Sequence, residues 1–276
     1  MMLQAVLEVV LKAIAGGVLV VVFALLAEGL APKRFAGVLA AAPSIALASL
    51  VVTLLMKDAF DARSASAGMV AGALGFVAYG LLAPVLMGRI GSIKGAAVAL
   101  LGWAAVAAVA FAVIAPASAG RFAVAAAGHR QQERERPHLE LKPHKILEAK
   151  PRDWAIRFAF GAGTSTIAGI VSAAAGPMPG GVFLAFPAIL LASLTLVKQE
   201  DGAARARDDA RGAAFGAVGL LAFALVGTTL FVALPWPLVL LLAAVAWAVV
   251  ALAAYGLAWL AGFGGDEPKE AGETPA

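Results

Sequence analysis

The sequence predicts an all-α, polytopic membrane protein with eight transmembrane helices, arranged as two parallel four-helix repeats. The chain is 62% hydrophobic and only 14% charged, whereas soluble domains carry about 25% charged residues. Its apolar runs are long enough to cross a bilayer core, which takes about 20 residues. A motif in residues 37–50 recurs in residues 181–194, and such duplication indicates a repeated structural unit.

The two motif copies share one offset, because Pro187 follows Pro43 by 187 − 43 = 144 positions. The same offset relates Arg63 to Arg207, and it also relates a tryptophan and three glycines in each half. These glycines are Gly68, Gly72 and Gly75 in the first half and Gly212, Gly216 and Gly219 in the second. Their spacing lets helix backbones approach closely, so we expect the spans that carry them to lie in the protein interior.

Four spans are expected in the first half, at residues 3–30, 35–56, 64–88 and 95–114. The uncharged part of the first run is too short to cross alone, so it must include Lys12 or Glu28. Glu8 and Lys12 are four residues apart, in the order that favours a helical ion pair. Pro43 lies in the middle of the second span and breaks its backbone hydrogen bonding.

Four more spans are expected in the second half, at residues 154–175, 181–197, 212–233 and 238–261. We therefore predict membrane repeats at residues 1–124 and 154–263. Between them, residues 125–153 are charged, contain all three histidines and are expected to form a cytoplasmic linker. Residues 264–276 are acidic and rich in Gly and Pro, which predicts a disordered tail.

The positions of the basic residues predict the orientation in the membrane. If the N-terminus, the linker and the tail share one side, that side holds all Lys and Arg except four, so 21 − 4 = 17. The positive-inside rule then places both termini in the cytoplasm of a bacterial cell, with the chain in the cytoplasmic (inner) membrane. Four spans is an even number, so the two halves are expected to insert in the same direction.

Candidate residues for a substrate path are the two mid-span prolines and the polar groups of the apolar spans. They are Pro43, Ser44, Ser49, Pro187, Ser193, Thr164, Ser165, Thr166 and Glu28. Broken helices at matching positions in two halves point to a central site in transporters. The alternative is that the prolines only shape helix packing and that the hydroxyls bond to their own helices.

Several functional classes lack support. The chain has no Cys, which excludes disulfides and thiolate metal sites, and the scattered histidines do not have metal-site spacing. We find no phosphate-binding loop and no hydrolase motif, so we expect no cofactor and no bound metal. The basic residues cluster at the ends of membrane spans, so nucleic acid is not the expected partner.

The pattern around Glu28, Gly37, Pro43, Ser49 and Arg63 resembles the GlpM-like family of bacterial inner-membrane proteins, a domain of unknown function. The second half repeats it at Gly181, Pro187, Ser193 and Arg207 but lacks the glutamate. This resemblance implies two four-span units fused in tandem. It also implies a loose link to exopolysaccharide production, and it supplies no catalytic residues.

The resulting hypothesis is a small secondary transporter or permease, with a site between the repeats for an unidentified small molecule. The alternative is a non-transporting membrane subunit that assists envelope or polysaccharide assembly. An enzyme is the least supported of the three. The expected partners are the lipid bilayer and the small molecule, and a homo-oligomer is left open.

Overall fold

The fold comes from a computed structural model, which describes residues 2–28, 33–126, 151–191 and 202–263. Throughout these ranges the secondary structure is helical, without strands. The first half comprises α1 (Met2–Glu28), α2 (Lys33–Ala40), α3 (Ser44–Met56), α4 (Ala59–Ile90) and α5 (Ser92–Ala126). The second comprises α6 (Pro151–Ala175), α7 (Pro177–Val182), η1 (Phe183–Ala185), α9 (Gly202–Leu230), α10 (Trp236–Ala258) and the π-helical turn η2 (Trp259–Phe263).

Seven helical segments in the described part of the chain are long and apolar enough to cross a membrane, with α2 and α3 together forming one of them. This confirms the prediction of an all-α, polytopic membrane protein. The eighth expected span, residues 181–197, continues into residues that the structure does not describe. Most of the expected linker and the whole of the expected tail also lie outside the described residues.

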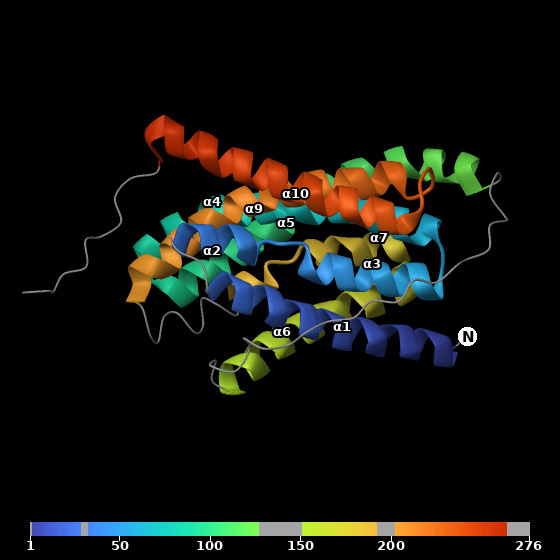
Figure 1. Ribbon diagram of the computed structural model, residues 1–276, viewed down its shortest axis with the longest axis horizontal. Helices are drawn as coiled ribbons and strands as arrows, with labels where there is room; N and C mark the ends of the chain where they lie inside the picture. Colours follow the sequence, from blue (N-terminus) through green and yellow to red (C-terminus); the bar gives the residue numbers. More distant parts are fainter. Residues whose placement is uncertain (1, 29–32, 127–150, 192–201, 264–276) are drawn as a thin grey trace, which may run out of the picture.

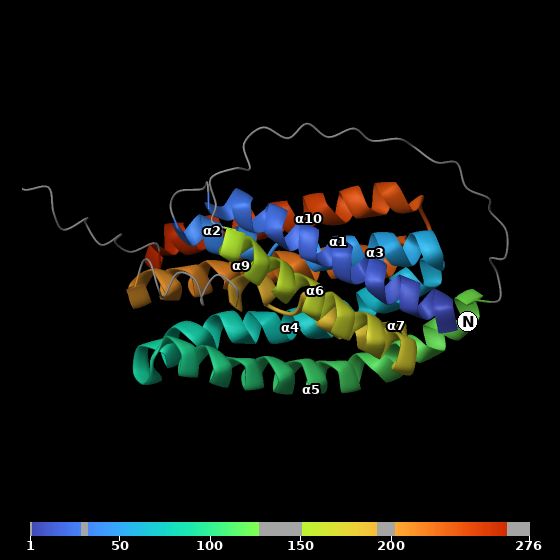
Figure 2. The same cartoon turned by 90° about the horizontal axis from the view of Figure 1, so that it is seen from below.

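The helices lie along one long bundle, with α4 and α9 in the middle (Figures 1 and 2). Helix α5 packs on the outer side of α4, α10 on the outer side of α9, and α1 pairs with α6. In the most apolar stretch of each span, 78% of the residues are buried in the broken helix α2–α3 and 56% and 50% in α4 and α9, against 28% or less in the outer helices. The interior is therefore built from the broken helix and from the two glycine-bearing helices.

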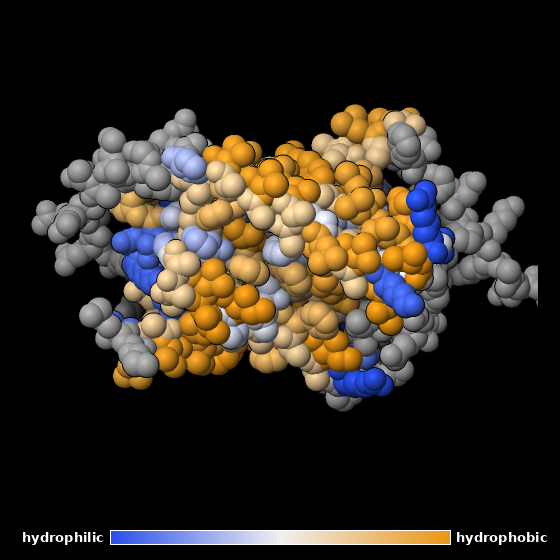
Figure 3. All heavy atoms as spheres, turned by 180° about the vertical axis from the view of Figure 1, so that it is seen from behind, coloured by the Kyte–Doolittle hydropathy of each residue, from blue (hydrophilic) through white to orange (hydrophobic). Residues whose placement is uncertain are grey.

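The surface around the middle of the bundle is apolar. Hydrophobic residues cover this belt, and hydrophilic residues gather toward the two ends (Figure 3). Large apolar side chains such as Leu101, Leu241 and Val249 are at least 60% exposed. Exposed apolar surface on this scale is unfavourable in water, so lipid is the solvent that this belt fits.

The sequence predicts parallel repeats, whereas in the bundle α4 and α9 pack antiparallel. Arg63, near the start of α4, hydrogen-bonds to Thr228 near the end of α9. Further along α4, Gly80 meets Ala214 of α9. Residue numbers therefore rise along one helix while they fall along the other. The count of basic residues assumed that the end of α5 and the start of α6 lie on the same side of the membrane. In the bundle these two points lie at opposite ends (Figures 1 and 2).

The same reversal separates the two described chain ends. Helix α1 starts at one end of the bundle, and α10 finishes at the other (Figure 1). The expectation that both termini lie on one side of the membrane stays a prediction.

The 144-residue offset survives in three dimensions as a pseudo-twofold axis. A Cβ at Gly72 would collide with the carbonyl oxygen of Val182, and one at Gly216 would collide with that of Val38. Since 216 − 72 and 182 − 38 both equal 144, these are the same contact made twice with the halves exchanged. The axis runs across the helices rather than along them, so each half is the inverted copy of the other.

Two tryptophans repeat this symmetry. The indole Nε1 of Trp103 in α5 donates to the carbonyl oxygen of Gly72 at 3.1 Å. Trp247 in α10 makes the equivalent bond to Gly216 at 3.2 Å. In membrane helices, an indole N–H needs such an acceptor when the ring is away from water. These bonds fasten each outer helix to the central helix of its own half.

Candidate functional site

The first helix break lies between α2 and α3, at Pro43. Proline has no N–H, so the α-helical bond to the carbonyl of Leu39 cannot form; the N–H of Ala42 bonds to that carbonyl instead, at 2.9 Å. The N–H of Ser44 turns to the carbonyl of Ala42 at 2.8 Å, and regular helix resumes when Leu47 bonds to the Pro43 carbonyl. The backbone is therefore non-helical for a few residues inside the bundle.

The second break lies at Pro187 and copies the first, bond for bond. The N–H of Phe186 donates to the carbonyl of Phe183, and the N–H of Ala188 donates to that of Phe186. The chain is helical again from Ala188 to Leu191, and Leu191 donates to the Pro187 carbonyl at 3.0 Å. Both prolines are buried. Irregular backbone at membrane depth occurs where protein or a cavity covers it.

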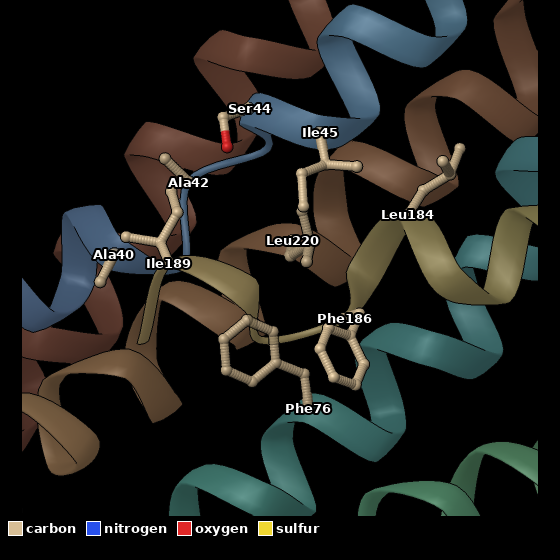
Figure 4. Close-up of a pocket in the computed structure, with 9 residues that line it drawn as sticks. All are labelled: Ala40, Ala42, Ser44, Ile45, Phe76, Leu184, Phe186, Ile189 and Leu220. Atoms are coloured by element: carbon tan, nitrogen blue, oxygen red, sulfur yellow. The ribbon is translucent and has the colours of Figure 1, made fainter. Parts of the chain in front are cut away.

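A small pocket lies between the two breaks (Figure 4). It takes residues from both halves, and most of them come in pairs related by the offset. They are Ala40, Ala42, Ser44, Ile45, Phe76, Leu184, Phe186, Ile189 and Leu220. The space for the centre of a water molecule is about 10 Å³, close to the minimum that one water needs. The pocket thus has room for about one water molecule, and Ser44 supplies the one polar side chain of its lining.

Trp103 fixes one wall of this pocket. Its ring lies perpendicular to that of Phe186, with centroids 5.2 Å apart, and it also contacts Phe183 at 6.0 Å. Edge-to-face geometry is favourable for aromatic rings. Since Trp103 is bonded to Gly72, the first half holds a pocket residue of the second half in place.

The predicted hydroxyl residues divide into two groups. Thr164 and Thr166 donate to the carbonyls one turn earlier, at 2.8 and 2.7 Å, which is the local bonding expected of a hydroxyl without another role. Ser49 and Ser165 are buried, and their hydroxyls have no hydrogen-bond partner among the described residues. Ser165 packs directly against Gly16 of α1. Unsatisfied buried hydroxyls are uncommon, so these two positions are candidates for polar contacts.

The remaining predicted positions contribute less to the site. Ser193 and the side chain of Glu28 lie outside the described residues. Gly68 lies against the carbonyl of Met178, and Gly212 is buried. Gly75 and Gly219 lie against the backbone carbonyls of Trp103 and Trp247, so these glycines serve helix contact rather than the pocket.

A buried cluster of charges was not among the predicted site residues. Glu8 and Lys12 are only 7% and 4% exposed, and their ion pair measures 2.6 Å. Lys57, at the end of α3, contacts Glu8 at 3.1 Å and Asp61 at 3.7 Å. The spacing of Glu8 and Lys12 signalled a helical pair, but not that the pair is buried between helices.

A second acid–base pair with the same spacing occurs in α6, at Asp153 and Arg157. Arg157 is 4% exposed. Where α1 crosses α6, Gly16 meets Ser165, and Gly161 meets Val20. These paired contacts relate the two helices by 161 − 16 = 145, which makes Asp153 the symmetry equivalent of Glu8 and Arg157 that of Lys12. A comparison of the halves at this shifted offset would have revealed the cluster from the sequence.

The depth of the first pair follows from helix geometry. The contacts Gly16–Ser165 and Gly161–Val20 exchange about the axis, so the axis is level with position (16 + 20)/2 = 18 of α1. Lys12 and Glu8 lie six and ten residues from that level, which is about 9 and 15 Å along a helix. Half of the hydrocarbon core is about 15 Å thick, so with the axis at the bilayer centre Lys12 lies within the core and Glu8 lies at its edge. Charged groups there are costly unless paired, and they often mark functional sites.

Within the described ranges, no group of three His, Asp or Glu side chains comes together. The pocket lining also contains no charged side chain.

These features define a class: a helical membrane protein built from two inverted four-helix repeats, with broken helices meeting at the centre. The chain belongs to the family described as "Protein of unknown function (DUF3147)", whose sequence pattern matches residues 9–115 and again residues 154–259. The two matches coincide with the two halves and confirm the tandem repeat. Nothing matches the chain among curated proteins or among solved structures. The resemblance to GlpM-like proteins remains an expectation.

Proposed function

We propose that the protein is a small secondary transporter or permease of the bacterial cytoplasmic membrane, whose path passes between the two broken helices. The observation that carries the proposal is the pair of breaks at Pro43 and Pro187, which face one pocket across the pseudo-twofold axis. Inverted repeats with discontinuous helices at the bilayer centre are a recurring transporter architecture, in which one half rocks against the other.

The lining restricts the substrate class. The side chains around the pocket are apolar except Ser44. A small neutral molecule with one or two hydrogen-bonding groups fits this surface. A charged substrate would lose its hydration without gaining an ionic partner in the pocket. Since the pocket has room for only about one water molecule, the path must widen toward one side at a time for such a molecule to pass.

The alternative function, a non-transporting membrane subunit for envelope or polysaccharide assembly, also has one observation in its favour. The pocket has room for no more than about one water molecule. A purely structural protein is expected to be dry at its centre, and a pocket this small is close to that. In that case the breaks would only set the packing of α2 and α7 against the central helices.

Cysteine accessibility tests the proposal, because the chain has no native Cys. Ser44→Cys and Ala188→Cys place a thiol at each break. The thiolate, which forms only where water reaches, is the nucleophile that attacks water-soluble thiol reagents. A transporter opens its path during the cycle, so both variants should react in membranes at measurable rates.

Two control variants set the scale. Ala46→Cys lies at a fully buried position two residues beyond Ser44 and should stay unreactive, whereas Lys94→Cys is exposed and should react fast. If Ser44→Cys and Ala188→Cys are as inert as Ala46→Cys, the pocket is dry and the structural alternative holds.

A further inference from the structure

The antiparallel packing of the halves conflicts with the path of a single chain across a membrane. Between the start of α1 and the end of α5 the chain makes four crossings, if α2 and α3 together count as one. An even number returns the chain to the side where it began. In the bundle, however, α6 begins at the end opposite to the last residue of α5 (Figures 1 and 2).

The connection between the halves cannot make the missing crossing. Residues 127–150 contain ten charged side chains and three histidines among 24 residues. A spanning segment needs about 20 predominantly apolar residues, and each charge at hydrocarbon depth is unfavourable. By composition, this segment stays on one side of the membrane, so both halves of one chain have the same orientation.

We propose that in the bilayer the antiparallel pair forms between two copies of this chain inserted in opposite orientations. The first half of each copy packs on the second half of the other, as in domain swapping, which exchanges an identical element between protomers. Every contact described above is preserved. A 24-residue connection reaches roughly 80 Å when extended, enough to link two neighbouring bundles on one side of the membrane.

The basic residues of the first half permit two orientations. Four lie toward the end where α1 begins, and four lie toward the other end. The first set is Lys12, Lys57, Arg63 and Arg121, and the second is Lys33, Arg34, Arg89 and Lys94. The half that is inserted first therefore carries no orientation signal of its own.

The basic residues of the second half lie mainly toward one end and therefore favour one orientation in the membrane. Its basic residues in the described part, Arg152, Arg157, Arg205, Arg207 and Arg211, gather at the starts of α6 and α9, and the connection adds six more. This bias favours one orientation of the whole chain. The opposed copy is therefore expected to be the minority before assembly, stabilised by pairing with the majority copy.

A disulfide between α1 and α6 tests which chains meet. A Cβ at Gly169 would lie 3.6 Å from the Cβ of Val9, within the range of disulfide geometry. Val9→Cys/Gly169→Cys is made in the full-length chain with a protease site inserted among residues 127–150. Membranes are oxidised, and products are separated by mass before and after cleavage, with each single variant as the control for random collisions.

The proposal predicts a covalent dimer that falls to the mass of one chain after cleavage, since each disulfide then joins a first half to a second half. A product at the mass of one chain both before and after cleavage contradicts it, because the halves then meet within one copy. Absence of the disulfide contradicts it equally, since α1 and α6 would not be antiparallel neighbours.

A second measurement does not depend on disulfide formation. Ile93 is 61% exposed at the turn between α4 and α5. In intact cells, Ile93→Cys should show one pool that a membrane-impermeant reagent labels and another that it labels only after lysis. Labelling of the whole population from one side only overturns the proposal.

Discussion

The Nε of Arg63 donates a hydrogen bond of 2.9 Å to the carbonyl oxygen of Thr228, joining the start of α4 to the end of α9. Its counterpart in the second half, Arg207, approaches Gly88 near the end of α4. These two arginines mark opposite ends of the central helix pair, so the bond reports directly on the antiparallel packing of the halves.

Replacing Arg63 should loosen this end of the bundle. Arg63→Gln removes a hydrogen bond from a charged donor, and we expect a loss of about 1 to 2 kcal/mol in the free energy of unfolding. The measurement is the melting temperature in detergent. Arg89→Gln is the control, because Arg89 is exposed in the last turn of the same helix. Equal melting temperatures for the two variants would show that the bond contributes nothing to stability.

The glycine contacts between the halves give a second prediction. Gly72→Ala and Gly216→Ala each add a methyl group where a carbonyl oxygen of the other half already lies. Overpacking of this kind costs about 1 to 3 kcal/mol. Gly256→Ala is the matched control, since nothing lies within 4 Å of a Cβ there and alanine favours helix. Both interface variants should have a lower melting temperature than the control. Equal melting temperatures for the three variants would show that these glycines do not lie at the interface.

The buried ion pair gives a third prediction. Glu8→Gln leaves Lys12 buried without its carboxylate, and breaking a buried pair in this way costs about 3 to 5 kcal/mol. Glu8→Met/Lys12→Met removes both charges and should recover most of the loss. Lys94→Gln, at an exposed position, should have little effect. Thermal unfolding in detergent checks the order, and a double variant less stable than Glu8→Gln would mean that the pair itself stabilises the fold.

A fourth prediction concerns the prolines. Pro43→Ala and Pro187→Ala restore an N–H to each break and favour continuous helix. If the breaks open the path, the double variant should be at least as stable as the parent, and a cysteine at position 44 should react more slowly with water-soluble reagents. Unchanged reactivity in that background would leave the prolines as shapers of packing only.

Much of the fold could be predicted from the sequence, because its signals are local. Apolar runs identify the segments that span the membrane. The shared offset of Pro43 and Pro187 identifies the two halves as repeats and predicts a broken helix in each. The positive-inside count could not fix how the halves pack, since it concerns the sides of the membrane and not the contacts between helices. The burial of Glu8 and Lys12 depends on α3 and α6, which meet α1 only in the folded bundle.

The central claim is that the two halves pack as inverted copies, and a distance between two spin labels tests it most directly. Leu55, near the end of α3, and Leu234, after α9, are both exposed, and α3 and α9 finish at the same end of the bundle (Figure 1). Labels on Leu55→Cys and Leu234→Cys should therefore include a pair, within one chain or between two paired copies, that is much closer together than the length of α4, whose 32 residues span about 48 Å. If the halves packed in parallel, these positions would lie on opposite sides of the membrane, and a distance distribution with no component shorter than that full length would contradict the account.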